Sequence, residues 1–463
     1  MTLDLAIRGG TLVVPGEGVF SADVGVVGEQ VALVAAPGAL PEAVRTLDAS
    51  GRYVLPGIVD PHAHFGVQTS FAQDVEHETR AALLGGVTTI GAFLREPVSY
   101  HEVFPRFRAE LEQHSSVDVF FHIVIATEEH LAEMAGYAER YGVTSFKAYL
   151  AGMHGLYRGV DDGFLLQLLQ QAAALGDQTL VCLHAENLGI VERATARVTA
   201  ALGDAPGTLA DWSAARPDVA EEEAIARSVF LGRLAGARVY IVHLTSGRGA
   251  ERVRALKAEY PRLYAETVTH YLSLDVENPL GAKLKRLPPL RTAADVEMLW
   301  AAVADGTVDT LGTDQVVATL AIKQPERGVL AAQGGFTTEA THLPVILTEG
   351  YHRRGLPLLR LVEAMTAAPA RLFGLYPRKG TIAVGSDADL VVVDLEAERR
   401  VAVAELPTWS DFSPWDGVPL RGWPTATVLR GQVAMEDGRL LVAPGAGRYL
   451  PRAAPASAAG ERT

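Results

Sequence analysis

Residues 81–94 read AALLGGVTTIGAFL, and this stretch shows the local pattern that decides the fold. A helix-like segment runs into glycine, which accepts the left-handed backbone after a last helical turn, and then into an apolar run rich in β-branched residues. The pattern returns at 138–150 (AERYGVTSFKAYL), 172–184 (AAALGDQTLVCLH) and 232–244 (GRLAGARVYIVHL). The apolar runs lack strict alternation, which is typical of strands buried on both faces of a parallel sheet.

Four further apolar runs bring the number of predicted strands to eight, between about residues 53 and 314. They are YVLPGIVDP at 53–61, VDVFFHIVI at 117–125, RLYAETVTHYL at 262–272 and GTVDTLGTD at 306–314. Eight successive βα units predict an α/β fold of the (β/α)₈ barrel type, also called a TIM barrel. A doubly wound open sheet is the alternative, but no Gly-x-Gly-x-x-Gly fingerprint follows the first strand to support it.

The two ends of the chain have a different texture from the middle. Short apolar stretches alternate with glycine turns in LAIRGGTLVV at 5–14, and a similar texture returns in DADLVVVDL at 387–395. Such patterns predict short antiparallel strands, and together they indicate one small β domain assembled from both termini. The expected boundaries are 1–54 and 375–445 for the β domain, 55–374 for the barrel, and 446–463 for a loose tail rich in Ala, Pro and Gly.

Composition excludes several classes of partner and location. The formal net charge of −14 over 463 residues argues against nucleic acid and anionic membranes, because neither attracts an acidic surface. The single cysteine, Cys182, allows no intramolecular disulfide, which fits a reducing cytoplasm. The sequence shows neither a signal peptide at its start nor an apolar run of about 18 residues, so we expect a cytoplasmic protein without a membrane span.

Residues able to bind a metal lie in or directly after five of the predicted strands. In a barrel, the carboxyl ends of the strands meet at one mouth, where active sites of this architecture lie. The two histidines of HAH also point the same way in an extended segment, because side chains alternate with period two. Each residue alone has an ordinary structural explanation, but their shared position favours a metal site. The residues are His62, His64, Lys147, His184, His243 and Asp314.

Histidine nitrogen and carboxylate oxygen are suitable ligands for zinc and similar divalent ions. A site this rich could hold two ions about 3.5–4 Å apart, the usual spacing for a bridging hydroxide nucleophile. Lys147 is the exception, because a protonated amine would repel the metals. It must therefore be neutral, turned away, or converted by CO₂ into a carbamate, and the residues alone leave these three alternatives open.

With PGIVDPHAH at 56–64 and the metal-binding residues that follow, the chain resembles the amidohydrolase superfamily. It is similar to the dihydropyrimidinase and hydantoinase branch over nearly its whole length, including VTSFKAYLAG, HAEN, YIVHLTS, LPPLR and APARLFGLYPRKGTIAVGSDADLVVVD. The resemblance implies that the barrel is paired with a small β-sandwich built from both termini. It also implies a homo-oligomer, either a tetramer or a dimer.

The resemblance further implies two divalent metal ions per chain, usually zinc. His62 and His64 would hold the more buried ion, and His184 and His243 the more exposed one. Lys147 would be present as N6-carboxylysine and would bridge both ions.

Asp314 would complete the metal set and act as the catalytic residue. In the implied reaction, the bridging hydroxide attacks a cyclic amide carbonyl that the exposed ion polarises. Asp314 takes the proton of the hydroxide and passes it to the leaving amide nitrogen, so general acid–base catalysis joins Lewis-acid polarisation.

The substrate residues depart from the pattern of the branch. Dihydropyrimidinases have a tyrosine five residues after the bridging lysine, where this chain has Gly152, and a serine where it has Leu287. The asparagine of their Asn-Gly-x-Pro-Gly loop corresponds to Gln333, and a usual histidine after the aspartate is Gln315. The arginine of dihydroorotases and the asparagine of allantoinases, two residues after the second histidine, are both replaced by Gly66.

These departures put the substrate contacts in doubt. Leu287 and Gln333 can still serve if they contact a ring amide through their main chain. The missing tyrosine hydroxyl is a larger loss, since one oxyanion donor is worth about 10²–10³ in rate. Our hypothesis is that Tyr149, His154 or Tyr157 supplies the donor; the alternative is that these residues only shape their loop.

The sequence therefore predicts a metal-dependent hydrolase that opens a small cyclic amide, either a dihydropyrimidine or a 5-substituted hydantoin, to an N-carbamoyl amino acid. Another ring, such as allantoin, dihydroorotate, an imide or a lactam, is the alternative within the enzyme class. A non-catalytic scaffold of the same fold is the alternative outside it, and retention of all six metal-binding residues argues against a scaffold.

Overall fold

The computed structural model of the chain describes residues 2–152 and 159–452. Eight strands follow one another in chain order across one sheet, and the pairs from β10 to β15 are parallel. This is the order of a (β/α)₈ barrel, so the predicted fold class is confirmed. The strands are β8 (Ile58–Ala63), β9 (Val87–Leu94), β10 (Asp118–Val124), β11 (Ser145–Tyr149), β12 (Leu180–His184), β13 (Arg238–Ile241), β14 (Leu263–Val268) and β15 (Thr310–Gly312).

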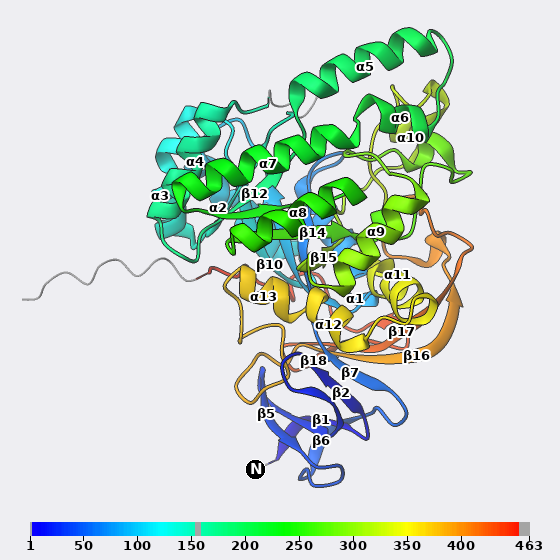
Figure 1. Ribbon diagram of the computed structural model, residues 1–463. Helices are drawn as coiled ribbons and strands as arrows, with labels where there is room; N and C mark the ends of the chain where they lie inside the picture. Colours follow the sequence, from blue (N-terminus) through cyan, green and yellow to red (C-terminus); the bar gives the residue numbers. More distant parts are fainter. Residues whose placement is uncertain (1, 153–158, 453–463) are drawn as a thin grey trace, which may run out of the picture. The chain divides into compact units, whose positions relative to one another are not determined.

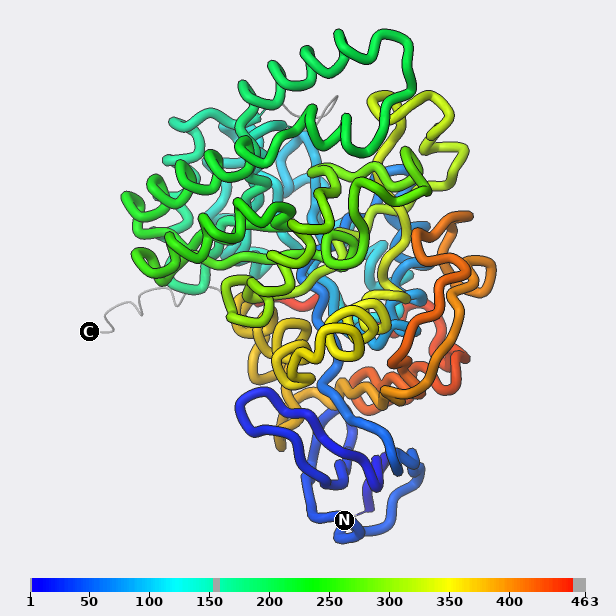
Figure 2. Tube along the Cα trace, turned by 45° about the vertical axis from the view of Figure 1, so that its right-hand side comes forward, coloured from blue at the N-terminus to red at the C-terminus, as the bar shows by residue number. Residues whose placement is uncertain are grey.

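Helices alternate with these strands, and their ends show why the sequence places them there. Thr127 caps α3 by accepting a hydrogen bond from the His130 N–H at 3.1 Å, and Gly142 ends it in the left-handed region at φ +66°. Gly236 ends α7 in the same way at φ +71°, as the helix–glycine–strand pattern predicts. Figures 1 and 2 show α7 and α8 side by side. The helices are α1 (Phe71–Leu84), α2 (Tyr100–His114), α3 (Glu128–Tyr141), α4 (Asp162–Ala174), α5 (Leu188–Leu202), α6 (Leu209–Ala215), α7 (Asp218–Ala235), α8 (Gly247–Glu259), α9 (Ala293–Ala304), α10 (Leu320–Lys323), α11 (His342–Ile346), α12 (Leu358–Met365) and α13 (Ala367–Leu372).

Two separate sheets come from the ends of the chain. The first has the order β5-β4-β1-β6, and the second joins both termini in the order β19-β18-β17-β16-β7-β2-β3. Figure 1 shows the blue strands β2 and β7 near the orange strands of the C-terminal part. One apolar cluster includes Leu12 and Val54 from the N-terminal part and Leu390 and Val428 from the C-terminal part. The strands are β1 (Leu3–Arg8), β2 (Thr11–Val14), β3 (Gly18–Ser21), β4 (Asp23–Val27), β5 (Gln30–Ala35), β6 (Ala43–Asp48), β7 (Tyr53–Pro56), β16 (Leu390–Arg400), β17 (Pro419–Leu429), β18 (Gln432–Glu436) and β19 (Arg439–Leu440).

The chain forms two compact units that interleave along the sequence. Unit 1 contains Met1–Gly91, Ala109–Val119 and Thr337–Tyr449, and unit 2 contains Ala92–Arg108, Phe120–Phe336 and Leu450–Thr463. The domain boundaries expected at residues 54 and 375 stay a prediction. No helix within the described ranges combines the length and the apolar character that crossing a membrane requires.

The first residues of the expected C-terminal tail are packed rather than loose. Tyr449 forms a parallel bridge with Val119 inside unit 1. In unit 2, Arg452 is buried, and its Nη1 donates a hydrogen bond of 2.6 Å to the Ser145 hydroxyl of β11. The expected tail therefore does not start at residue 446, because backbone pairing and a buried guanidinium hold this part of the chain. Residues 453–463 lie outside the described residues.

Candidate metal centre

The first pair of predicted ligands comes from β8 and the residue that follows it in unit 1. His62 and His64 are both buried, and their Nε2 atoms lie 3.2 Å apart. The His62 N–H donates to Oδ1 of Asp60 at 3.1 Å, which steadies the backbone between the two rings. Two nitrogens that share a tetrahedral ion at about 2.0–2.1 Å are about 3.3–3.4 Å apart, so this spacing fits a common ion.

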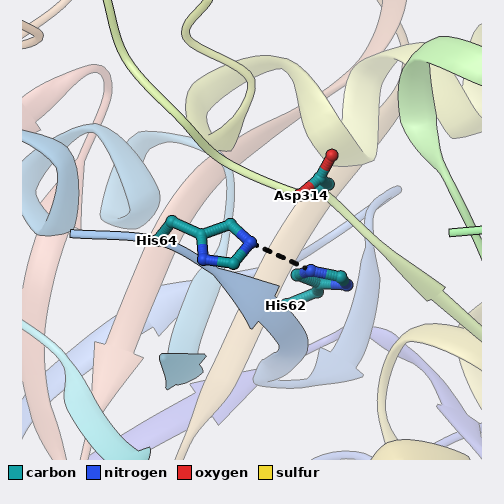
Figure 3. Close-up of side chains that lie close together, drawn as sticks. All are labelled: His62, His64 and Asp314. Carbon is teal, nitrogen blue, oxygen red and sulfur yellow. Dashed lines mark hydrogen bonds between the residues drawn. The ribbon is translucent and has the colours of Figure 1, made fainter. Parts of the chain in front are cut away.

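Asp314 of unit 2 is the third predicted ligand of this group, and it is buried there. Figure 3 shows the His62 and His64 rings with a dashed line between their nearest nitrogens. The group offers two imidazole nitrogens and one carboxylate oxygen, the donor set of many sites for divalent ions. Together with their burial, this arrangement suggests a divalent metal centre.

The second pair of predicted ligands lies in unit 2. His184 ends β12, and its Nδ1 lies 3.0 Å from Nε2 of His243, with the ring centroids 4.6 Å apart. Burial lowers the pKa of His184, which keeps its ring neutral at neutral pH. A neutral imidazole offers one lone pair to a metal, so the structure brings two suitable nitrogens together here.

The tautomer of His184 is set by a carboxylate behind it. Its Nε2 lies 2.6 Å from Oε2 of the buried Glu186, and Arg216 binds the same carboxylate through Nε at 3.0 Å and through Nη2. Burial acts to raise the pKa of Glu186, but the Arg216 guanidinium and the His184 bond hold it below its usual range. An ionised carboxylate only accepts, so Nε2 carries the proton and Nδ1 keeps the free lone pair.

Two of the predicted ligands have an unusual backbone. His243 has φ +41° and Asp314 has φ +48°, both in the left-handed region that residues other than glycine rarely adopt. The His243 N–H donates to Oε1 of the buried Glu266 at 3.2 Å, and the Tyr240 hydroxyl donates to Oε2 at 2.8 Å. Strained backbone held by a buried acid is typical of functional sites.

Lys147 lies in β11 of unit 2 and is fully buried. Within the described ranges its Nζ makes no hydrogen bond, and its neighbours are the rings of Phe93 and Tyr149, with centroids at 4.8 Å and 5.1 Å. Burial lowers its pKa from 10.5 to about 8. About a tenth of this amine is therefore neutral at pH 7, far more than for an ordinary lysine, which makes it more reactive toward an electrophile such as CO₂.

The predicted substrate residues differ from one another in how deeply they are buried. The ring of Tyr149 is buried, 5.4 Å from that of His184. Leu287 is partly buried, and Gln333 is exposed, with its backbone paired to that of Lys323. Gly152 is buried with φ +71°. The candidates His154 and Tyr157 lie outside the described residues.

Sequence reasoning assigned no role to the acids behind the ligands. Glu186 stands two residues after His184 in HAEN, and that spacing could have marked it, because side chains two apart in an extended segment share a face. Glu266 carries no comparable signal, since its contact with His243 crosses 23 positions of the sequence.

Comparisons with known proteins agree with this geometry. Residues 53–434 match the model of the amidohydrolase family. The chain is 33% identical to an L-hydantoinase of Paenarthrobacter aurescens, over 95% of this chain and 96% of that protein. It is 36% identical to an allantoinase of Rubrobacter xylanophilus, over 96% and 97% of the two chains. The solved structure of an L-hydantoinase (dihydropyrimidinase) from Arthrobacter aurescens superposes with a TM-score of 0.91 at 32% identity, covering 96% of this chain and 99% of that one.

Proposed function

This chain belongs to the amidohydrolase family, and on that basis we propose that it is a metal-dependent hydrolase of cyclic amides. The substrate is a dihydropyrimidine or a 5-substituted hydantoin, and the product is the N-carbamoyl amino acid. The relatives named as hydantoinases support this substrate class.

The observation that carries the proposal is the spacing of the two histidine pairs. Nitrogen atoms of His62 and His64 lie 3.2 Å apart, and those of His184 and His243 lie 3.0 Å apart. In each pair the two nitrogens are close enough together to bind the same ion. Each pair therefore supports one divalent ion, which we take to be zinc because the donors are imidazole nitrogen and carboxylate oxygen.

When bound, the two ions would supply an activated water and an electrophile for the ring carbonyl. Lys147, as N6-carboxylysine, would replace its unpartnered amine by an anionic group that both ions can share. Asp314 would accept a proton on its carboxylate and return it to the amide nitrogen as the ring opens, the task of a general acid–base. Leu287 and Gln333 would hold the ring amide through their main chain, and Tyr149 is the described candidate for a donor to the carbonyl.

Two further parts of the proposal rest on the resemblance and the composition. We take the protein to be a homo-oligomer, a tetramer or a dimer, as the branch implies. We also place it in the cytoplasm, since its one cysteine, Cys182, is buried and free.

The test is a metal analysis followed by a panel of rings. Purified protein should hold about two divalent ions per chain and hydrolyse hydantoins or dihydrouracil faster than dihydroorotate and succinimide. The variant His184→Asn should lose bound metal and turnover together. Two ions with no turnover of any ring would reject these substrates, and the absence of both metal and turnover would favour a scaffold.

Allantoin is the second candidate substrate, because the allantoinase relative is 36% identical over nearly the full chain. It is also a 5-substituted hydantoin, so the same site could open its ring. A preference for allantoin over 5-alkylhydantoins in the same panel would assign the chain to this activity.

A further inference from the structure

Three buried arginines of unit 2 differ in what their guanidinium groups contact. Arg216 uses Nε and Nη2, the two donors on one edge of the group, to bind the Glu186 carboxylate. Arg291 donates from Nε to the Thr245 hydroxyl at 3.0 Å and from Nη1 to the Arg216 carbonyl at 2.6 Å. Arg286 is only 2% exposed, yet within the described part of the chain its Nε and Nη2 make no hydrogen bond.

Burying Arg286 in this way is costly for the fold. A guanidinium stays charged at every accessible pH, and an unpaired buried charge is strongly unfavourable. The ring of Phe336 has its centroid 4.0 Å from the guanidinium carbon, a favourable contact that offers no hydrogen-bond acceptor. The free edge, with two parallel donors, has the shape that a carboxylate fills in bidentate fashion.

The surroundings of Arg286 connect this free edge to the proposed substrate site. Leu287 is the next residue, and Phe336 belongs to the same loop as Gln333. Phe336 also forms an antiparallel bridge with Val316, two residues after Asp314. Burial lowers the pKa of Arg286, and the Asp314 carboxylate, which has the largest effect of any nearby charge, acts to raise it. Arg286 is thus tied to both predicted substrate segments and to the proposed catalytic acid.

We propose that Arg286 is a specificity-determining residue that binds a carboxylate substituent on the ring, through Nε and Nη2, as Arg216 binds Glu186. The preferred substrate is then a cyclic amide that carries an acidic side group. This inference rests on the proposed function and narrows its substrate class. Hydrolysis of any ring amide creates a carboxylate in the product, so the substituent must be tested separately.

The test compares two rings that differ in charge alone. Hydantoin-5-acetic acid carries a carboxylate, and hydantoin-5-acetamide has nearly the same shape without the charge. We expect the wild-type protein to prefer the acid by at least about tenfold in kcat/KM. Arg286→Met should lower kcat/KM for the acid by about 10²-fold, mainly through KM, and leave the amide within about threefold. Equal losses on both rings, or no loss on either, would overturn the proposal.

Lys285 supplies the matched control, because it is the adjacent cation and also stacks on a ring. Its Nζ lies 4.2 Å from the centroid of a Trp212 ring, but it already donates to the Leu330 carbonyl at 2.7 Å. Lys285→Met should therefore change kcat/KM for the two rings by the same factor. A selective loss of the acid in Lys285→Met would show that any nearby charge suffices and would contradict a role for Arg286.

Direct binding separates this inference from the proposed function. Calorimetric titration of the purified holoenzyme with the acid and the amide, over times too short for turnover, should show that Arg286→Met weakens the acid alone. If neither ring is ever hydrolysed but this selectivity holds, the hydrolase proposal fails and the carboxylate site stands. If both rings are hydrolysed and bound without preference, the carboxylate site fails and the hydrolase proposal stands.

Thermal unfolding shows whether Arg286→Met loses activity only because the variant no longer folds. Arg286→Met should be at least as stable as the wild type, since it removes an unpaired charge. Should it unfold, Arg286→Lys keeps the charge but lacks the fork, and it should still lose at least about tenfold on the acid. A lysine variant that binds the acid like the wild type would overturn the bidentate contact.

Discussion

Two fully buried lysines, one in each unit, have opposite surroundings. Lys379 of unit 1 places its Nζ 2.6 Å from Asp118, 3.0 Å from Asp387 and 2.5 Å from Asp389. Burial opposes its charge, but the three carboxylates hold the pKa of Lys379 above its usual value. Lys147 of unit 2 has aromatic rings as neighbours, and burial lowers its pKa to about 8.

The difference separates a lysine that forms buried ion pairs from one that we propose takes part in the chemistry. Asp118, Asp387 and Asp389 form a group that could itself hold a cation, and Lys379 already fills it. A buried amine surrounded by acids forms an internal salt bridge. A buried charged amine without an acidic partner lowers the stability of the fold. The same contrast holds between Arg216, bound to Glu186, and Arg286.

The largest effect on turnover is expected when the buried amine of Lys147 is removed. Lys147→Met should lower kcat by at least about 10³-fold, because the site loses the group proposed to be shared by both ions. In metal-free protein, its unfolding free energy in urea should be no lower than that of the wild type, since no acidic partner is left unpaired. A variant with near-normal turnover would contradict the assigned role.

The reverse pattern is expected at Lys379. Lys379→Met should lower the unfolding free energy by about 3–5 kcal/mol, because three buried carboxylates lose their common cation. Turnover per folded molecule should stay within a factor of two or so at low denaturant. Urea unfolding combined with active-site titration measures both quantities, and an unchanged midpoint would show that Lys379 is dispensable.

A pH series sharpens the comparison in metal-free protein. Between pH 8 and 10.5 the unfolded chain keeps the Lys147 proton that the folded chain has released, so stability should rise with pH. The wild type minus Lys147→Met difference in unfolding free energy should rise by roughly 2–3 kcal/mol across this window. The same difference taken with Lys379→Met should stay level, because a raised pKa gives a contribution that is lost only above that range. Parallel curves for the two variants would contradict the comparison.

The smallest effect is expected at Glu186, which lies between the proposed ligand His184 and Arg216. Glu186→Gln should weaken metal binding by about tenfold, since His184 loses the acceptor that sets its tautomer. Competition with a chelator measures this affinity. Glu192→Gln, on the exposed part of α5, is the control that should leave it unchanged.

The barrel could be predicted, and candidate ligands proposed, because local patterns mark the helix ends and the strand ends. Glycine after a helical stretch marks the ends of α3 and α7, and ligands at strand ends share one mouth in this architecture. The family match over residues 53–434 agrees with the predicted family, while the individual metal ligands stay a prediction.

The parts that escaped prediction depend on tertiary packing. Arg286 stands in KLKRLPPLR, where a run of cations predicts a solvated loop, and its burial arises from packing on Phe336, fifty positions later. The backbone strain at His243 and Asp314 likewise has no local signal, because histidine and aspartate adopt either conformation in loops.

The bond from Arg452 to Ser145 has a practical consequence for handling the protein. Ser145 also contacts Nδ1 of His122 at 2.6 Å and stands two residues before Lys147 on the same strand. A protease that cleaves the chain before residue 452 during storage would remove the hydrogen bond from Arg452 to that strand. Batches should therefore be checked by intact mass, since ageing could mimic an active-site defect through damage at the far end of the polypeptide.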